Sequence, residues 1–160
     1  MKTESKSPKR KSVKAIPKGF NSITPFLVVE GADDFIEFVE KAFDGKTTFI
    51  MRTDDDQVMH ASVQIGDSQV MVTDAMKNYP AATCKLYLYV EDSDAVFEQA
   101  IEAGGTSLRE PTTEFYGDRA GGVKDAWGNE WWISTHVEDV DDKELEKRKK
   151  KFEEQQAVNA

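Results

Sequence analysis

Apolar residues recur at helical spacing in two stretches of the chain, and each stretch follows a short apolar run. The recurring positions are Phe35, Phe38, Val39, Ala42 and Phe43 in the first stretch, and Val96, Phe97, Ala100 and Ile101 in the second. Residues three and four apart share one face of a helix, so the pattern predicts two amphipathic helices. Asp33, and Ser93 or Asp94, are the candidate N-terminal caps. Both stretches run into glycine, which favours the left-handed conformation that ends many helices.

Strand patterns follow each predicted helix. The expected strands are 47–54, 57–65 and 69–73 after the first helix, and 107–109, 122–124 and 131–135 after the second. Turn residues separate the first set at 54–56 and 66–68, at hairpin-like spacing. A longer loop is expected over 110–121. Because hairpins join these strands, much of each sheet should be antiparallel, which favours an α+β fold.

The chain therefore repeats one pattern, strand-helix-strand-strand-strand, about sixty residues apart. We expect a single domain over 22–138, built from modules at about 22–76 and 83–138. Charged side chains spaced for exposed pairing predict a peripheral helix at 139–154, within a C-terminal segment of helix and tail at 139–160.

Charge divides unevenly along the 160 residues. Residues 1–22 carry seven Lys or Arg against one Glu, a net of +6; because the whole chain is −9, the remainder carries −15. We interpret residues 1–21 as a basic disordered leader. An acidic body disfavours phosphate backbones, and no apolar run is long enough to cross a bilayer, so we expect neither a nucleic-acid nor a membrane partner. A single cysteine, Cys84, indicates a cytoplasmic protein without an internal disulfide.

Several short motifs are similar to those of a known family. These are Ile23–Val29, Met59–Ala61, Tyr116–Arg119 followed by Gly128, and Trp132–Val140. With the repeated pattern they resemble the vicinal oxygen chelate superfamily of glyoxalase I, bleomycin-resistance proteins, fosfomycin-resistance enzymes and extradiol dioxygenases, and more narrowly its PhnB-like branch. The resemblance implies two tandem βαβββ modules whose mixed, mostly antiparallel sheets curl round a cavity. Dimerisation often completes such a cavity, so a homodimer is expected.

Metal-using members of that superfamily hold a divalent ion with His and Glu from equivalent strands of the two modules. The matching positions here are Thr24, Val70 or Met71, Lys85 and Trp132. Threonine is a poor ligand, lysine repels a cation and tryptophan has no lone pair to offer. We therefore expect no cofactor. The alternative left open is a divalent metal held differently, by His60 and His136 with Asp74 or Glu130.

Alternation along the strands places aromatic and polar side chains on the cavity side. The expected ligand-binding residues are Phe26, His60, Lys85, Tyr87, Tyr89, Tyr116, Arg119 and Trp132. Such a lining is typical of a pocket for a small hydrophobic or aromatic molecule, although Phe26, Tyr87 and Trp132 would equally suit a core. Arg119 is read either as holding its loop through an ion pair or as binding an anionic ligand.

The sequence is compatible with three functions. The first is a metal-independent small-molecule binding protein with an aromatic pocket. The second is a metal-dependent glyoxalase-, lyase- or dioxygenase-like enzyme, in which His60 or Glu130 would act as a base. The third is an interaction protein that uses its charged tails. One fold hosts many functions, so the resemblance alone does not choose among them.

Overall fold

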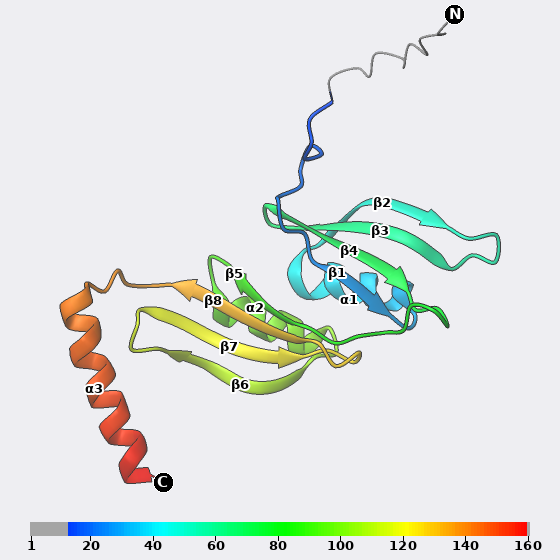
Figure 1. Cartoon of the computed structure of the whole chain (residues 1–160). Coiled ribbons are helices and arrows are strands. Elements are labelled where there is room, and N and C mark those ends of the chain that lie inside the picture. Colours follow the sequence, from blue (N-terminus) through cyan, green and yellow to red (C-terminus); the bar gives the residue numbers. More distant parts are fainter. Residues whose placement is uncertain (1–12, 160) are drawn as a thin grey trace, which may run out of the picture.

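The computed structural model describes residues 13–159, in which two modules of similar design follow one another (Figure 1). The first contains β1 (Phe26–Val29), α1 (Ala32–Phe43), β2 (Lys46–Arg52), β3 (Val58–Ile65) and β4 (Ser68–Asp74). The second contains β5 (Lys85–Tyr89), α2 (Ser93–Glu102), β6 (Thr106–Thr113), β7 (Asp118–Lys124) and β8 (Glu130–His136). The helix α3 (Asp142–Asn159) follows. Twelve residues of the predicted leader lie outside the described residues, and 13–21 form neither helix nor strand.

The strand orders of the two sheets are equivalent. They are β1-β4-β3-β2 in module 1 and β5-β8-β7-β6 in module 2. In each sheet the first strand pairs in parallel with the last, and the other pairs are antiparallel. The predicted α+β fold of two tandem βαβββ modules is confirmed.

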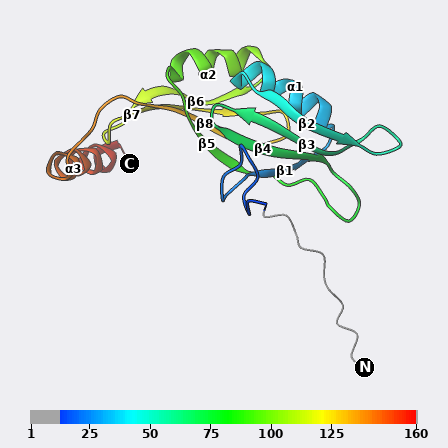
Figure 2. The same ribbon diagram turned by 90° about the horizontal axis from the view of Figure 1, so that it is seen from above.

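Helices α1 and α2 pack against each other and lie on the same side of both sheets (Figures 1 and 2). The opposite side carries no helix within the described chain, and we call it the open face. The β5–β8 register puts Tyr87 opposite Trp132 and Tyr89 opposite Ser134. The alternation of side chains then assigns every second residue of β5, β7 and β8 to the open face, whereas register shifts interrupt the alternation in the β2–β3 and β6–β7 pairs.

Two tryptophans of the β7–β8 turn region join the modules into one core. Trp127 packs edge-on against Phe35 of α1 with ring centroids 5.1 Å apart, and its Nε1 donates to the carbonyl of Glu30 at 2.7 Å. Trp131 is 1% exposed and lies 4.5 Å from the Phe43 ring. Because both aromatic contacts cross from module 2 to α1, the hydrophobic core is continuous between the modules.

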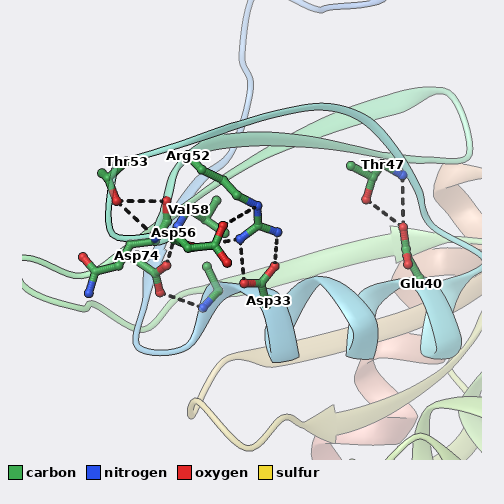
Figure 3. A network of polar contacts seen from close by, with 10 residues as sticks. Asp33, Glu40, Thr47, Arg52, Thr53, Asp56, Val58 and Asp74 are labelled. Atoms are coloured by element: carbon green, nitrogen blue, oxygen red, sulfur yellow. Dashed lines mark hydrogen bonds and ion pairs between the residues drawn. The ribbon is translucent and has the colours of Figure 1, made fainter.

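The helix starts differ from the predicted caps. Gly31, in the left-handed region at φ 73°, is the N-cap of α1, and Asp33 lies in the first helical turn. The Asp33 carboxylate is bound instead by the Arg52 guanidinium, at 2.7 and 2.9 Å (Figure 3). In α2 the cap is Asp92, whose side chain accepts from the Ala95 N–H, and not Ser93 or Asp94.

Asp74 holds the start of α1 in place. Its two carboxylate oxygens accept from the backbone N–H groups of Ala32 and Val58, at 2.8 and 2.7 Å (Figure 3). One side chain at the end of β4 thereby fixes the first residue of α1 and the first residue of β3. In module 2 the equivalent residue is Thr135, whose hydroxyl oxygen accepts from the Ser93 N–H at 2.8 Å.

The predicted loop over 110–121 is wrong, because β6 and β7 form a longer hairpin with its turn at residues 114–117. Pro111 is tolerated because β6 is an edge strand, where a missing N–H costs no ladder bond. The terminal helix begins three residues later than predicted, at Asp142, and none of its described residues is buried. None of the helices in the described chain is long and apolar enough to cross a membrane.

Candidate functional site

Three aromatic side chains form the centre of the open face in module 2. Tyr87 and Tyr89 are 49% and 63% exposed, with ring centroids 5.3 Å apart. Trp132 lies on the neighbouring strand β8, opposite Tyr87. A Cβ added to Gly122 would lie 3.1 Å from the Trp132 indole, so glycine at this position lets the ring approach the backbone of β7 closely. Half-exposed aromatic rings on rigid strands offer stacking surfaces for a flat ligand.

Two cations flank these rings, and both are paired with carboxylates. The Arg109 guanidinium lies 5.1 Å from the centre of the Trp132 ring and pairs with Glu114 at 2.6 Å. The Lys85 ammonium lies 3.0 Å from Glu130. Its hydrogen bond is the main reason that the pKa of Glu130 is lowered, which makes this carboxylate a weaker proton acceptor than an unpaired glutamate.

A polar chain closes one end of the aromatic row. The Tyr89 hydroxyl donates to Asp118 Oδ2 at 2.9 Å, and His136 Nδ1 lies 2.7 Å from Asp118 Oδ1. The second ring nitrogen, Nε2, lies 2.8 Å from Asp139 Oδ1. Burial acts to raise the pKa of Asp118, but the hydrogen bonds from His136 and Tyr89 outweigh it and the pKa is lowered. The Asp118 bond raises the pKa of His136, with Asp139 adding to the effect.

Tyr116 lies beside this chain, in the turn between β6 and β7. Burial, together with a hydrogen bond to Tyr87, raises the pKa of Tyr116 to about 12. The phenol therefore stays protonated across the physiological range.

The open face of module 1 is apolar by comparison. His60 lies between two phenylalanine rings, each with its centroid 6.1 Å away: Phe26 of β1 and Phe49 of β2. Tyr79, from the loop after β4, packs 5.9 Å from Phe26. Met51 is the cross-strand partner of His60. Nothing in this surrounding positions an acidic group to orient His60 as a catalytic base.

The comparison with protein families identifies the fold family. Residues 19–133 match the model of the Glyoxalase/Bleomycin resistance protein/Dioxygenase superfamily. The chain belongs to this superfamily. The match spans both modules, from the residues before β1 to the middle of β8.

Relatives of this glyoxalase-superfamily chain include uncharacterized proteins of Mycobacterium. One, from Mycobacterium bovis, is 29% identical over 136 residues, covering 78% of this chain and 90% of that protein. Among solved structures, TioX from Micromonospora aligns with a TM-score of 0.60 at 18% identity, covering 72% of this chain and 99% of that one. A PhnB protein from Bacillus cereus aligns with a TM-score of 0.55 at 23% identity, covering 72% and 99%. At these identities the solved structures establish the fold.

The four positions that match metal ligands of the glyoxalase superfamily do not fit a divalent cation here. The register makes Met71 the equivalent of Trp132, because Met71 lies opposite Phe26 as Trp132 lies opposite Tyr87. These positions hold Thr24, the thioether of Met71, the ammonium of Lys85 and the indole of Trp132. The ammonium is bound to Glu130, and the indole lies next to Arg109. Within residues 13–159 no three His, Cys, Asp or Glu side chains are grouped to hold an ion.

The alternative metal set is not brought together either. Asp74 is bonded to two backbone N–H groups and Glu130 to Lys85. His60 lies on β3 of module 1, whereas His136 is enclosed by its two aspartates at the end of β8.

The eight expected ligand-binding residues lie on two different sides of the sheets. Those on the open face are Phe26, His60, Lys85, Tyr87, Tyr89 and Trp132, with Tyr116 at its rim beside Tyr87. Arg119 does not join them: alternation along β7 turns it to the helix side, where its guanidinium binds Asp94 of α2 at 2.6 and 2.7 Å. Sequence reasoning missed Arg109, Phe49 and Tyr79, for which only proximity after folding gives a signal.

Proposed function

We propose that this chain is a PhnB-like, cytoplasmic, metal-independent protein that binds a small aromatic or hydrophobic molecule on its open face. The observation that carries the proposal is the row of Tyr87, Tyr89 and Trp132, in which both tyrosines are about half-exposed or more, the tryptophan is partly buried, and paired charges flank the rings. Stacking on such rings contributes about 0.5–1.5 kcal/mol per aromatic pair beyond burial of area. Side chains at the equivalents of metal-ligand positions add to the stacking surface instead of coordinating an ion.

The same proposal includes a homodimer. Rings of both modules lie open to solvent in a single chain, among them Phe26, Phe49 and Tyr87, each exposed by nearly half. A second copy laid over the open face would convert these exposed rings into two walls of one cavity, which is the arrangement that best encloses a small molecule.

Binding is tested with a library of planar aromatic compounds, read by intrinsic fluorescence and by thermal shift. Trp132 is the tryptophan on the open face, and Trp127 and Trp131 belong to the inter-module core. We expect binders whose affinity falls at least tenfold in Trp132→Leu. The control is Val158→Ala, which removes an 85%-exposed apolar side chain near the end of α3 and should leave affinity unchanged.

Two outcomes would overturn parts of the proposal. Calorimetric titration with Ni²⁺, Zn²⁺, Mn²⁺ and Fe²⁺ that shows stoichiometric micromolar binding would overturn metal independence. Sedimentation equilibrium that gives a monomer at binding-competent concentrations would overturn the dimer. A library screen in which all hits bind Trp132→Leu as well as the wild type would overturn the assignment of the site.

A further inference from the structure

We propose that Tyr89 faces the ligand as a hydrogen-bond acceptor, so that this corner of the open face selects molecules that carry an N–H or O–H donor. The inference rests on the proposed binding function and specifies the chemistry of its ligand. It follows from the direction in which the protons of the chain Tyr89–Asp118–His136–Asp139 must point.

Asp118 determines the direction of the first hydrogen bond. The residue is 5% exposed, and both of its carboxylate oxygens are in use, one by Tyr89 and one by His136. An ionised carboxylate accepts hydrogen bonds and cannot donate them. The proton in the 2.9 Å contact must therefore come from the Tyr89 hydroxyl.

His136 keeps Asp118 in that role. Its Nδ1 and Nε2 lie 2.7 and 2.8 Å from carboxylate oxygens, so the protonated ring donates to both aspartates. The imidazolium donates to Oδ1 and leaves Oδ2 for Tyr89. A charged donor next to a nearly buried carboxylate favours its ionised form and fixes its orientation.

The consequence falls on the Tyr89 oxygen. A phenol has a single O–H proton, and in Tyr89 this proton is engaged in the hydrogen bond to Asp118. The Tyr89 oxygen therefore presents only its lone pairs to a molecule that approaches the exposed ring. The neighbouring Ser134 hydroxyl is fully buried, so it lies out of reach of a ligand. A ligand that brings only acceptors would place them against the Tyr89 oxygen without a proton between them.

The test uses two planar probes of similar size, 2-naphthol as the donor and 2-methoxynaphthalene as the acceptor without a donor. We expect the wild-type protein to bind 2-naphthol more tightly by about three- to tenfold, the effect of one neutral hydrogen bond. Tyr89→Phe should abolish this preference. Ser107→Ala, which removes a hydroxyl that binds Glu110 on the helix side of the sheet, should leave the ratio of affinities unchanged.

Asp118→Asn gives the sharper result, because it should reverse the polarity of the corner. The His136 Nδ1–H would retain the amide oxygen, which turns the amide NH₂ toward Tyr89. The Tyr89 oxygen then accepts and its O–H is released toward the ligand. We expect the preference for 2-naphthol to disappear and the affinity for 2-methoxynaphthalene to rise by about three- to tenfold.

The outcomes separate this inference from the binding function beneath it. If both probes bind the wild-type protein equally, or if Tyr89→Phe keeps the preference, donor selection by Tyr89 is overturned while the binding function stands. If neither probe binds at any accessible concentration and the library screen also gives no binder, the binding function is overturned and donor selection with it. If Asp118→Asn does not fold, by circular dichroism, the Tyr89→Phe ratio decides alone.

Discussion

The two modules share their backbone arrangement and their helix contacts, but they differ in the side chains on the open face. In both, the second residue of the helix is an aspartate bound by an arginine fork: Asp33 by Arg52 in module 1, and Asp94 by Arg119 in module 2. The arginines come from different strands, β2 and β7, so the same helix contact is reached by two routes. On the open face the modules diverge: module 1 carries methionine and mutually tilted rings, and module 2 carries aromatic rings together with paired charges.

The helix side and the open side of these sheets are therefore under different structural constraints. The helix side must bury apolar area and anchor helix starts, which restricts both modules to similar contacts. The open side carries no such restriction, and this is where module 2 concentrates Lys85, Arg109 and the Asp118 chain. Variants on the two sides should therefore differ in kind, by stability on one side and by binding on the other.

The largest effect on stability is expected from a comparison of two adjacent tryptophans, one on each side of the sheet. Trp131→Ala removes a fully buried ring and its Nε1 hydrogen bond to Asp125, and should lower the free energy of unfolding by about 4 kcal/mol. Trp132→Ala, on the open side, should cost about 1 kcal/mol because the ring is already partly solvated. Urea denaturation of both variants gives the comparison, and equal losses would contradict the division into two sides.

The next effect compares the residues that anchor each helix start. Asp74→Ala leaves two backbone N–H groups without their charged acceptor and should cost about 3 kcal/mol. Thr135→Val removes a neutral hydroxyl that accepts from the Ser93 N–H and donates to the Val90 carbonyl, and should cost about 1–2 kcal/mol. Thermal unfolding followed by circular dichroism measures both. A larger loss in Thr135→Val would show that the module 2 anchor is the stronger one.

A smaller effect is expected at the arginine forks. Arg52→Ala and Arg119→Ala each remove a bidentate pair that is partly open to solvent, so each should lower the melting temperature only slightly, and less again in high salt. The two values should be similar, because the contacts are equivalent. Double-mutant cycles with Asp33→Ala and Asp94→Ala isolate the pair energies, and a marked inequality would break the equivalence.

The smallest effect is a pH dependence confined to module 2. The pKa of His136 is raised in the folded chain, mainly by Asp118, so its contribution to stability is present below about pH 6.5 and is lost as pH rises through the folded pKa. The stability difference between the wild type and His136→Gln should therefore be greater at about pH 5.5 than at about pH 8.5. Module 1 has Ala75 at the equivalent position, so it holds no counterpart of this group.

The repeated frame was predictable because apolar spacing reports which face of an element is buried. The residues that begin the helices were less predictable from the sequence. Asp33 has the side chain of an N-terminal cap, but Arg52, which is distant in sequence, binds its carboxylate instead. The hairpin of β6 and β7 was missed because proline and paired glycines imitate a loop. Gly121 in fact belongs to a strand, where a Cβ would come within 3.0 Å of Phe97 and Pro111.

The candidate site was predictable to the extent that it follows strand alternation. Lys85, Tyr87, Tyr89 and Trp132 share a face because they alternate along neighbouring strands. The pairing of Asp118 with Tyr89, and of Arg109 with Trp132, depends on which strands become neighbours. Such contacts join residues distant in sequence, and periodicity within one strand carries no information about them.

The contact of Trp127 with module 1 also has a consequence for synthesis of the chain. Glu30 and Trp127 are 97 positions apart, so α1 leaves the ribosome long before the indole that covers Phe35. Trp131, which covers Phe43, emerges later still. The contacts that cover this edge of α1 can therefore form only after the β7–β8 turn and β8 have been synthesised.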